Sequence, residues 1–148
     1  MKRILLFLVF VGNVYGNQTK NLYDAEAVLV NKKGIYFMNR SDAARFLNVI
    51  FEDQWFKSRY NIKMPIVVRS EREGWAYSVI GNGVGKIAIP DKGCWNYNVL
   101  HELAHHLTPK NSHEKEFAKT EIILIEHFIN ANAAKALRKS FKEKGVQF

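Results

Sequence analysis

The residues best suited to chemistry are 101–105, which read His-Glu-Leu-Ala-His within an apolar stretch. On an α-helix, positions i and i+4 differ by about 40° around the axis and about 6 Å along it, so His101 and His105 can face one ion. Catalytic zinc takes three protein ligands and a water, and a neighbouring carboxylate can accept the proton of that water. The segment therefore predicts a zinc hydrolase in which Glu102 is the general base.

A third protein ligand has to come from outside this helix. The metzincin extension would place glycine at position 108 and histidine at position 111, where this chain has Thr108 and Asn111, so that subclass is excluded. His113 follows a proline-containing turn, and a helix that begins there would bring its ring back over the ion. Glu121 and Glu126 are the alternatives, and either would make a His-His-Glu site. We favour His113; Glu121 lies about 12 Å further along the same predicted helix, too far for both to bind one ion.

Helices and strands that would position these residues follow from hydrophobic periodicity and breakers. Helices are expected over 17–30, from an N-cap at Ser41 to about 56, over 95–107, from His113 to about 130, and over the basic C-terminal segment. Strands are expected at 66–68, 75–80 and 85–89, the last two joined by a turn at 81–83. This order predicts an α+β fold in which a small antiparallel sheet packs on the active-site helix. The strand 86–89 would form the edge along which an extended peptide could bind.

Composition is consistent with one domain of ordinary size. The chain has 148 residues, 47% of them hydrophobic and 13% aromatic, enough for a substantial core. Its single cysteine, Cys94, excludes an intramolecular disulfide and argues against a Cys-x-x-Cys zinc ribbon. We therefore expect a single domain over 17–148.

The net charge of +8 arises from 22 basic and 14 acidic residues and is compatible with an anionic partner. Five basic side chains fall close together in the predicted C-terminal helix: Lys135, Arg138, Lys139, Lys142 and Lys144. We interpret them as a solvated face, and the alternative is a patch that binds nucleic acid through its phosphates.

Residues 1–16 resemble a signal peptide. Lys2 and Arg3 precede an apolar run, too short to span a bilayer, and the small residue Gly16 would allow cleavage before Asn17. This pattern predicts export of the mature protein and no stable membrane span. The alternative is a cytoplasmic protein in which these residues form a buried first strand or precede the domain.

From Asn17 onward the chain resembles a family of small zinc metallohydrolases from bacteria and their phages, related in motif to the SprT-like and WLM zincin domains. The segments that carry the resemblance are 18–26, 67–69, 101–109 and 141–146, together with 113–117, which reads His-Glu-Lys-Glu-Phe. The family has glycine where this chain has Glu114. The resemblance implies a zincin-like domain in which His101, His105 and His113 bind Zn²⁺ and Glu102 is the catalytic base.

These observations predict a metallopeptidase in which a zinc-activated water attacks a peptide carbonyl and Glu102 transfers the proton to the leaving nitrogen. Its partner would be a protein or peptide substrate. The second hypothesis is a basic module that zinc only stabilises and that binds nucleic acid or protein. A fourth protein ligand would distinguish this structural site from a catalytic one.

Overall fold

The computed structural model describes residues 17–81 and 83–148. The predicted signal peptide, residues 1–16, lies outside the described residues. Helical residues 17–26 continue into the short 3₁₀ helix η1. The elements that follow are η1 (Ala27–Leu29), β1 (Phe37–Met38), α2 (Arg40–Glu52), α3 (Gln54–Arg59), β2 (Ile66–Arg69), β3 (Tyr77–Val79), β4 (Lys86–Ile89), β5 (Cys94–Trp95), α4 (Asn96–Leu107), α5 (Lys115–Phe128) and α6 (Ala131–Lys144).

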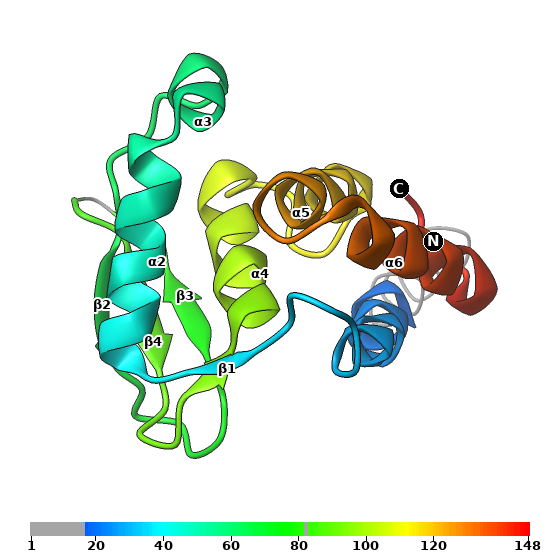
Figure 1. Cartoon of the computed structure of the whole chain (residues 1–148), viewed down its shortest axis with the longest axis horizontal. Coiled ribbons are helices and arrows are strands. Elements are labelled where there is room, and N and C mark those ends of the chain that lie inside the picture. Colours follow the sequence, from blue (N-terminus) through cyan, green and yellow to red (C-terminus); the bar gives the residue numbers. More distant parts are fainter. Residues whose placement is uncertain (1–16, 82) are drawn as a thin grey trace, which may run out of the picture.

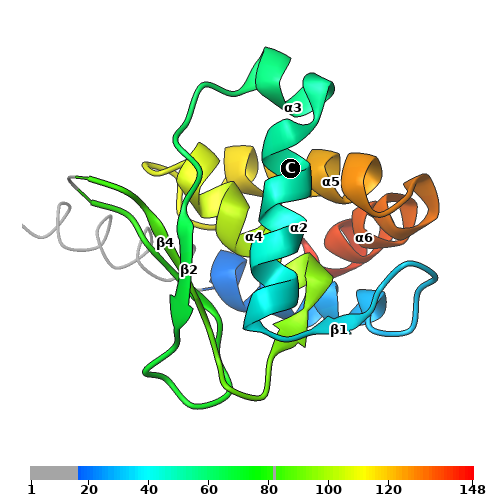
Figure 2. The same cartoon turned by 60° about the vertical axis from the view of Figure 1, so that its left-hand side comes forward.

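The fold is mixed α+β, as predicted, and α4 lies at its centre (Figure 1). On one side α4 contacts β3 and β4, and on the other it packs against α5. Helix α6 packs against α5 and returns to η1, while α2 covers β2 (Figure 2). Helix α4 is therefore held between a sheet and a helical layer, and both layers supply buried apolar side chains to one core.

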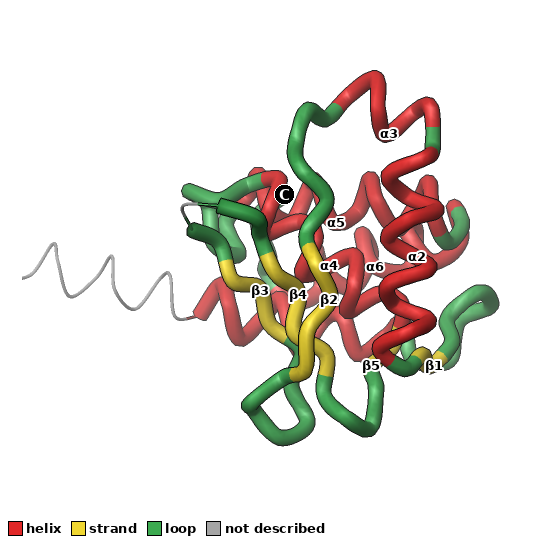
Figure 3. Tube along the Cα trace, turned by 90° about the vertical axis from the view of Figure 1, so that its left-hand side faces the viewer, coloured by secondary structure: helices red, strands yellow, loops and turns green. Residues whose placement is uncertain are grey.

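The larger sheet has the strand order β2-β4-β3 (Figure 3). Strand β4 pairs in parallel with β2 and antiparallel with β3. The predicted antiparallel sheet with 86–89 at its edge is therefore wrong: the sheet is mixed, β4 is its central strand, and β3 is the edge strand beside α4. The nearly continuous burial of Ile87, Ala88 and Ile89 fits a strand with neighbours on both sides.

A second, two-stranded antiparallel sheet pairs β1 with β5, which the sequence did not predict. It brings the chain directly to the start of α4. Gly93 has a φ of 87°, and a Cβ at this position would lie 2.3 Å from the Met38 carbonyl oxygen. The close approach of the two strands therefore requires glycine.

Most predicted helices are present with shifted ends. Helix α2 is capped by Asn39, whose side chain accepts a hydrogen bond from the Asp42 amide at 2.9 Å, and not by Ser41. The helix ends at Glu52 and α3 begins separately, because the Asp53 side chain caps the Phe56 amide at 2.9 Å. Within the described part of the chain, no helix is both long and apolar enough to cross a membrane.

Candidate metal centre

The polar side chains of α4 that could take part in chemistry are buried. Its first turn is fixed by Asn98, whose side-chain oxygen accepts a hydrogen bond from the Trp95 amide at 3.1 Å. The following turns bury one face completely, including Val99, Leu100 and Leu103. His101 is only 2% exposed and Glu102 only 6%, so both polar side chains are enclosed by the same packing. Such burial is costly for polar groups unless they have partners.

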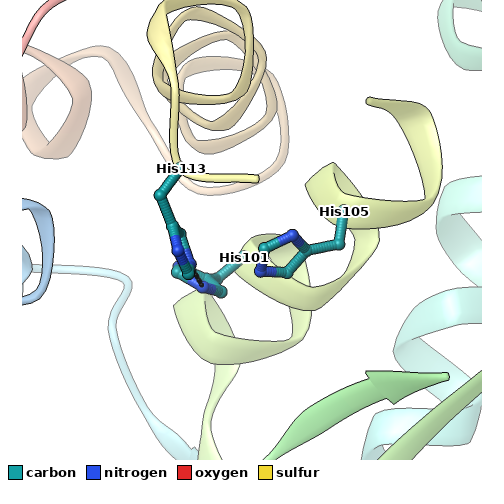
Figure 4. Close-up of side chains that lie close together, drawn as sticks. All are labelled: His101, His105 and His113. Atoms are coloured by element: carbon teal, nitrogen blue, oxygen red, sulfur yellow. Dashed lines mark hydrogen bonds between the residues drawn. The ribbon is translucent and has the colours of Figure 1, made fainter. Parts of the chain in front are cut away.

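The rings of His101, His105 and His113 meet at one point (Figure 4), and their nearest nitrogens all lie within 4.8 Å of one another. His113 Nε2 is 3.2 Å from His101 Nε2. Two nitrogens that bind one zinc ion at tetrahedral angles lie roughly 3.3 Å apart, given Zn–N bonds of about 2.0–2.1 Å. The three histidines therefore offer the donor type that zinc binds, and the His101–His113 distance is that of two ligands of one ion. No fourth ligand joins this group among residues 17–81 and 83–148.

His113 reaches this point through an unusual backbone conformation. Its φ is 55°, in the left-handed region, which is uncommon for a residue other than glycine. Glu114 follows with extended backbone angles that any residue can adopt, and it occupies the N-cap position of α5 without a side-chain capping hydrogen bond. The strained residue is the candidate ligand itself, as is typical of functional sites.

Two carboxylates lie within hydrogen-bond distance of the other ring nitrogen of His101, Nδ1. Its Nδ1 lies 2.6 Å from Glu26 Oε1 and 3.3 Å from Glu121 Oε1, and both acids are buried. A spacing of 2.6 Å is that of a hydrogen bond and is short for two ligands of one zinc ion. We therefore assign Glu26 and Glu121 to orienting the imidazole, in the manner of the carboxylate–histidine pairs that support metal sites. Glu121 Oε2 has no hydrogen-bond partner among the described residues.

The protonation of the three rings is set by burial and by these acids. Burial, with the positive charge of His101, lowers the pKa of His105 to about 3 and that of His113 to about 4. Both rings are therefore neutral at pH 7 and can donate a lone pair to a metal. Burial also opposes protonation of His101, but Glu26 and Glu121 outweigh it and raise its pKa well above 6.5. Burial, and then the charge of Glu26, raises the pKa of Glu121 to about 8.

Glu102 is held beside the histidines by the edge strand. Ser78 Oγ on β3 lies 2.8 Å from Glu102 Oε2 and 2.8 Å from the Glu102 backbone carbonyl oxygen. Burial raises the pKa of Glu102, while His101 and the Ser78 hydrogen bond partly offset the rise. A carboxylate with a raised pKa is a better proton acceptor, as general-base catalysis requires.

A cleft of about 410 Å³ opens over Glu102, His105 and His113. Tyr23 forms part of its wall, with its ring stacked on His101 at 5.3 Å between centroids and edge-on to His113 at 5.0 Å. On the β3 side, the Arg72 guanidinium lies 4.8 Å from the centre of the Tyr77 ring, and both residues line the cleft. The site is therefore open to a ligand on the face where the three histidine nitrogens converge.

Other polar residues of the chain lie outside the histidine group. Glu126 is on the surface, where its carboxylate accepts a hydrogen bond from Arg138 at 2.5 Å, and does not belong to the histidine group. His106 points to the sheet, where its Nε2 donates to the Lys86 carbonyl oxygen at 3.2 Å. No basic residue of α6 lines the cleft over Glu102, and Lys139 lies 3.7 Å from Glu143.

Sequence reasoning missed Tyr23, Glu26 and Ser78. A signal was available for Glu26, because it lies four residues after Leu22 and one after Ala25, on the buried face of its helix. An acid on an apolar helical face requires a buried partner, which here is His101. No comparable signal marks Ser78 or Tyr23, whose roles depend on how β3 and the first helix pack against α4.

Comparisons of the chain with protein-family models, curated proteins and solved structures found no match. The resemblance to small zinc metallohydrolases therefore remains a prediction from the motifs. The function has to be argued from the geometry of the chain's own residues.

Proposed function

We propose that this protein is a zinc-dependent metallohydrolase, and most specifically a metallopeptidase. The observation that carries the proposal is the convergence of three histidine nitrogens within 4.8 Å, beside a buried glutamate and next to an open cleft that Glu102, His105 and His113 line. His101, His105 and His113 would hold the ion. The absence of a fourth ligand among the described residues favours a catalytic over a structural site.

Zinc bound by the three rings would lower the pKa of water and polarise a substrate carbonyl. Side chains of the protein carry out the proton transfers and position the reacting groups. Glu102 accepts a proton from the attacking water and returns it to the leaving nitrogen. Ser78 keeps the Glu102 carboxylate in place through its 2.8 Å hydrogen bond. Tyr23 covers one face of His101 and limits the access of bulk water to that ring.

A peptide is the favoured substrate because of the strand beside the cleft. Strand β3 pairs with β4 on one side and is at the edge of its sheet on the other. The free edge carries backbone donors and acceptors to which an extended peptide can add as another strand. Tyr77 and Ser78 of this strand line the cleft that contains Glu102. A bound strand would thus pass close to the proposed catalytic groups.

The test compares wild type, Glu102→Gln and the control Glu126→Gln, each analysed for zinc content and for cleavage of a mixture of fluorogenic peptides. We expect about one zinc per chain in all three proteins, since Glu102 is not a ligand. We expect Glu102→Gln to lower kcat by roughly 10²–10⁴-fold, because it removes the proton acceptor. Glu126→Gln, on the exposed face of α5, should match wild type.

Undiminished turnover in Glu102→Gln would exclude Glu102 as the base. Stoichiometric zinc in a folded wild-type protein that cleaves no peptide in the mixture would instead support the second hypothesis, a module that zinc only stabilises.

A further inference from the structure

A second hollow adjoins the cleft, on the side of α4 that faces β1 and β5. Its volume is about 390 Å³, within the range of small-ligand pockets. Aromatic side chains from separate segments line it, namely Phe37 on β1, Trp75 before β3, Trp95 on β5 and Tyr97 on α4. His101 and Glu102 form its inner end. The hollow is thus an aromatic pocket that ends at the proposed catalytic groups.

The hollow and the cleft share a wall. Tyr23, Trp75, Ala76 and Glu102 line both spaces. Tyr23 and Trp75 contact each other edge to face, with ring centroids 6.5 Å apart. A ligand that reaches Glu102 from the cleft therefore has the aromatic hollow immediately beside its reacting group.

Three of the aromatic residues that line the hollow are exposed to an unusual degree, whereas Tyr97 is buried. Trp75 is 64% exposed, Phe37 52% and Tyr23 41%, although the core of this chain buries other large aromatic side chains completely. Exposed apolar side chains that gather around one concavity are typical of a binding surface. Their position indicates that the ligand is an apolar group.

The charges around the hollow also favour an uncharged, apolar ligand. No lysine or arginine lines it among the described residues, so an acidic side chain would find no cationic partner there. The two carboxylates at its inner end are already engaged, Glu26 with His101 Nδ1 at 2.6 Å and Glu102 with Ser78 Oγ at 2.8 Å. A basic side chain would have to compete with these hydrogen bonds, whereas an uncharged ring would only cover the aromatic walls.

We infer that this hollow is the specificity pocket of the enzyme and binds a large apolar side chain, aromatic in preference, next to the bond that is cleaved. The inference rests on the proposed function for the identity of its ligand as a peptide substrate. The pocket determines which peptides are held over Glu102, while the cleft and the β3 edge bind the backbone.

The test fills the hollow without touching the catalytic groups. Ala27 in η1 lines the hollow with an exposed side chain, so Ala27→Phe places a ring into the space without disturbing the core. The matched control is Ala131→Phe, an exposed alanine at the start of α6 that lines neither space. Circular dichroism and thermal unfolding would check that both variants remain folded.

Binding is measured on full-length, zinc-loaded protein that carries Glu102→Gln, so that cleavage of the probe is slow compared with the measurement. The probes are acetyl-Ala-Ala-Phe-Ala-Ala-amide and its analogues with Ala or Lys at the central position. Tryptophan fluorescence reports directly on the pocket, because Trp75 and Trp95 line it. We expect the Phe peptide to bind roughly ten- to a hundredfold more tightly than the Ala peptide, from burial of one ring.

Ala27→Phe should reduce this preference to within about twofold, and Ala131→Phe should preserve it. Equal binding of the Phe and Ala peptides, tightest binding of the Lys peptide, or a preference unchanged by Ala27→Phe would each overturn the inference. Selective binding of the Phe peptide without turnover by the wild-type enzyme would leave the pocket intact and refute the proposed function. Turnover by the wild-type enzyme without any preference for Phe would refute the pocket and leave the proposed function intact.

Discussion

At the scale of single residues, the site depends on the two different environments of the His101 ring. Its Nε2 faces His113 at 3.2 Å, and its Nδ1 faces Glu26 at 2.6 Å and Glu121 at 3.3 Å. A carboxylate can accept only from a protonated Nδ1, so these acids hold a proton on Nδ1 and leave Nε2, once its own proton is released, as the nitrogen that can bind a metal. Since the acids are buried, neither can turn to water instead.

Removing the charge of Glu26 should therefore weaken zinc binding. For Glu26→Gln we expect a 10–100-fold loss of zinc affinity, the usual effect of losing an orienting carboxylate. The measurement is competition with a chromophoric zinc chelator. Asp24→Asn is the control, because Asp24 lies on the same helix and pairs on the surface with Lys20. Equal zinc affinity in Glu26→Gln and wild type would show that Glu26 does not support the ligand.

At the scale of elements, the contact of α4 with the sheet determines where the histidines lie. His106, immediately after the second candidate ligand, donates through Nε2 to the Lys86 carbonyl oxygen at the start of β4. Its ring lies directly over Gly85, where a Cβ would be 2.5 Å from the ring carbon Cε1. Glycine at this position therefore leaves room for the His106 ring against the start of β4.

Gly85→Ala should push the His106 ring away from β4 and cost about 0.5–1.5 kcal/mol of stability through loss of its hydrogen bond to the Lys86 carbonyl oxygen. The matched control is Gly81→Ala in the same β3–β4 connection, where an added Cβ would meet no atom within 4 Å. We expect Gly81→Ala to change stability by no more than about 0.5 kcal/mol. Urea unfolding of both variants would measure the difference, and equal effects would contradict the close-contact explanation.

The helices were predictable because their burial is periodic along the chain. The pattern of α5, for example, follows Phe117, Ala118, Ile122 and Ile125, all of which are buried. The role of β4 was not predictable, since a short run such as Lys86–Ile89 has the same appearance in an edge strand and in a central one. Strands β1 and β5 have only two residues each, too few to give a period.

The candidate metal ligands could be predicted from the sequence more fully than the carboxylates that orient His101. The structure brings His101, His105 and His113 together as their spacing predicted. The alternative ligand Glu121 does reach His101, but at the nitrogen that faces away from the other two histidines. Sequence spacing gives the position of Glu121 along α5, whereas the ring nitrogen that it meets depends on how α5 packs against α4.

At the scale of the whole molecule, the site joins segments that are distant in the chain. The first helix provides Tyr23 and Glu26, β3 provides Ser78, α4 provides two histidines and the turn before α5 provides the third. The C-terminal residues return to the first helix, where the Gln147 amide donates to the Gln18 side chain at 3.2 Å. A metal at the histidines would cross-link α4 to the turn before α5, the two segments around which the other site residues gather.

This cross-link predicts that zinc stabilises the folded protein. A ligand that binds only the native state at 100 times its Kd adds about 2.7 kcal/mol, which corresponds to a rise in Tm of roughly 5–15 °C for a chain of this size. His113→Asn should abolish the rise, because it removes one ligand while asparagine still tolerates the left-handed backbone at this position. His106→Asn is the control: it loses the contact with Lys86 and lowers the starting Tm, but it should keep the full increment on adding zinc. Differential scanning calorimetry with and without a chelator separates the two effects. A zinc increment that survives His113→Asn, or that disappears equally in His106→Asn, would mean that zinc does not join α4 to the turn before α5.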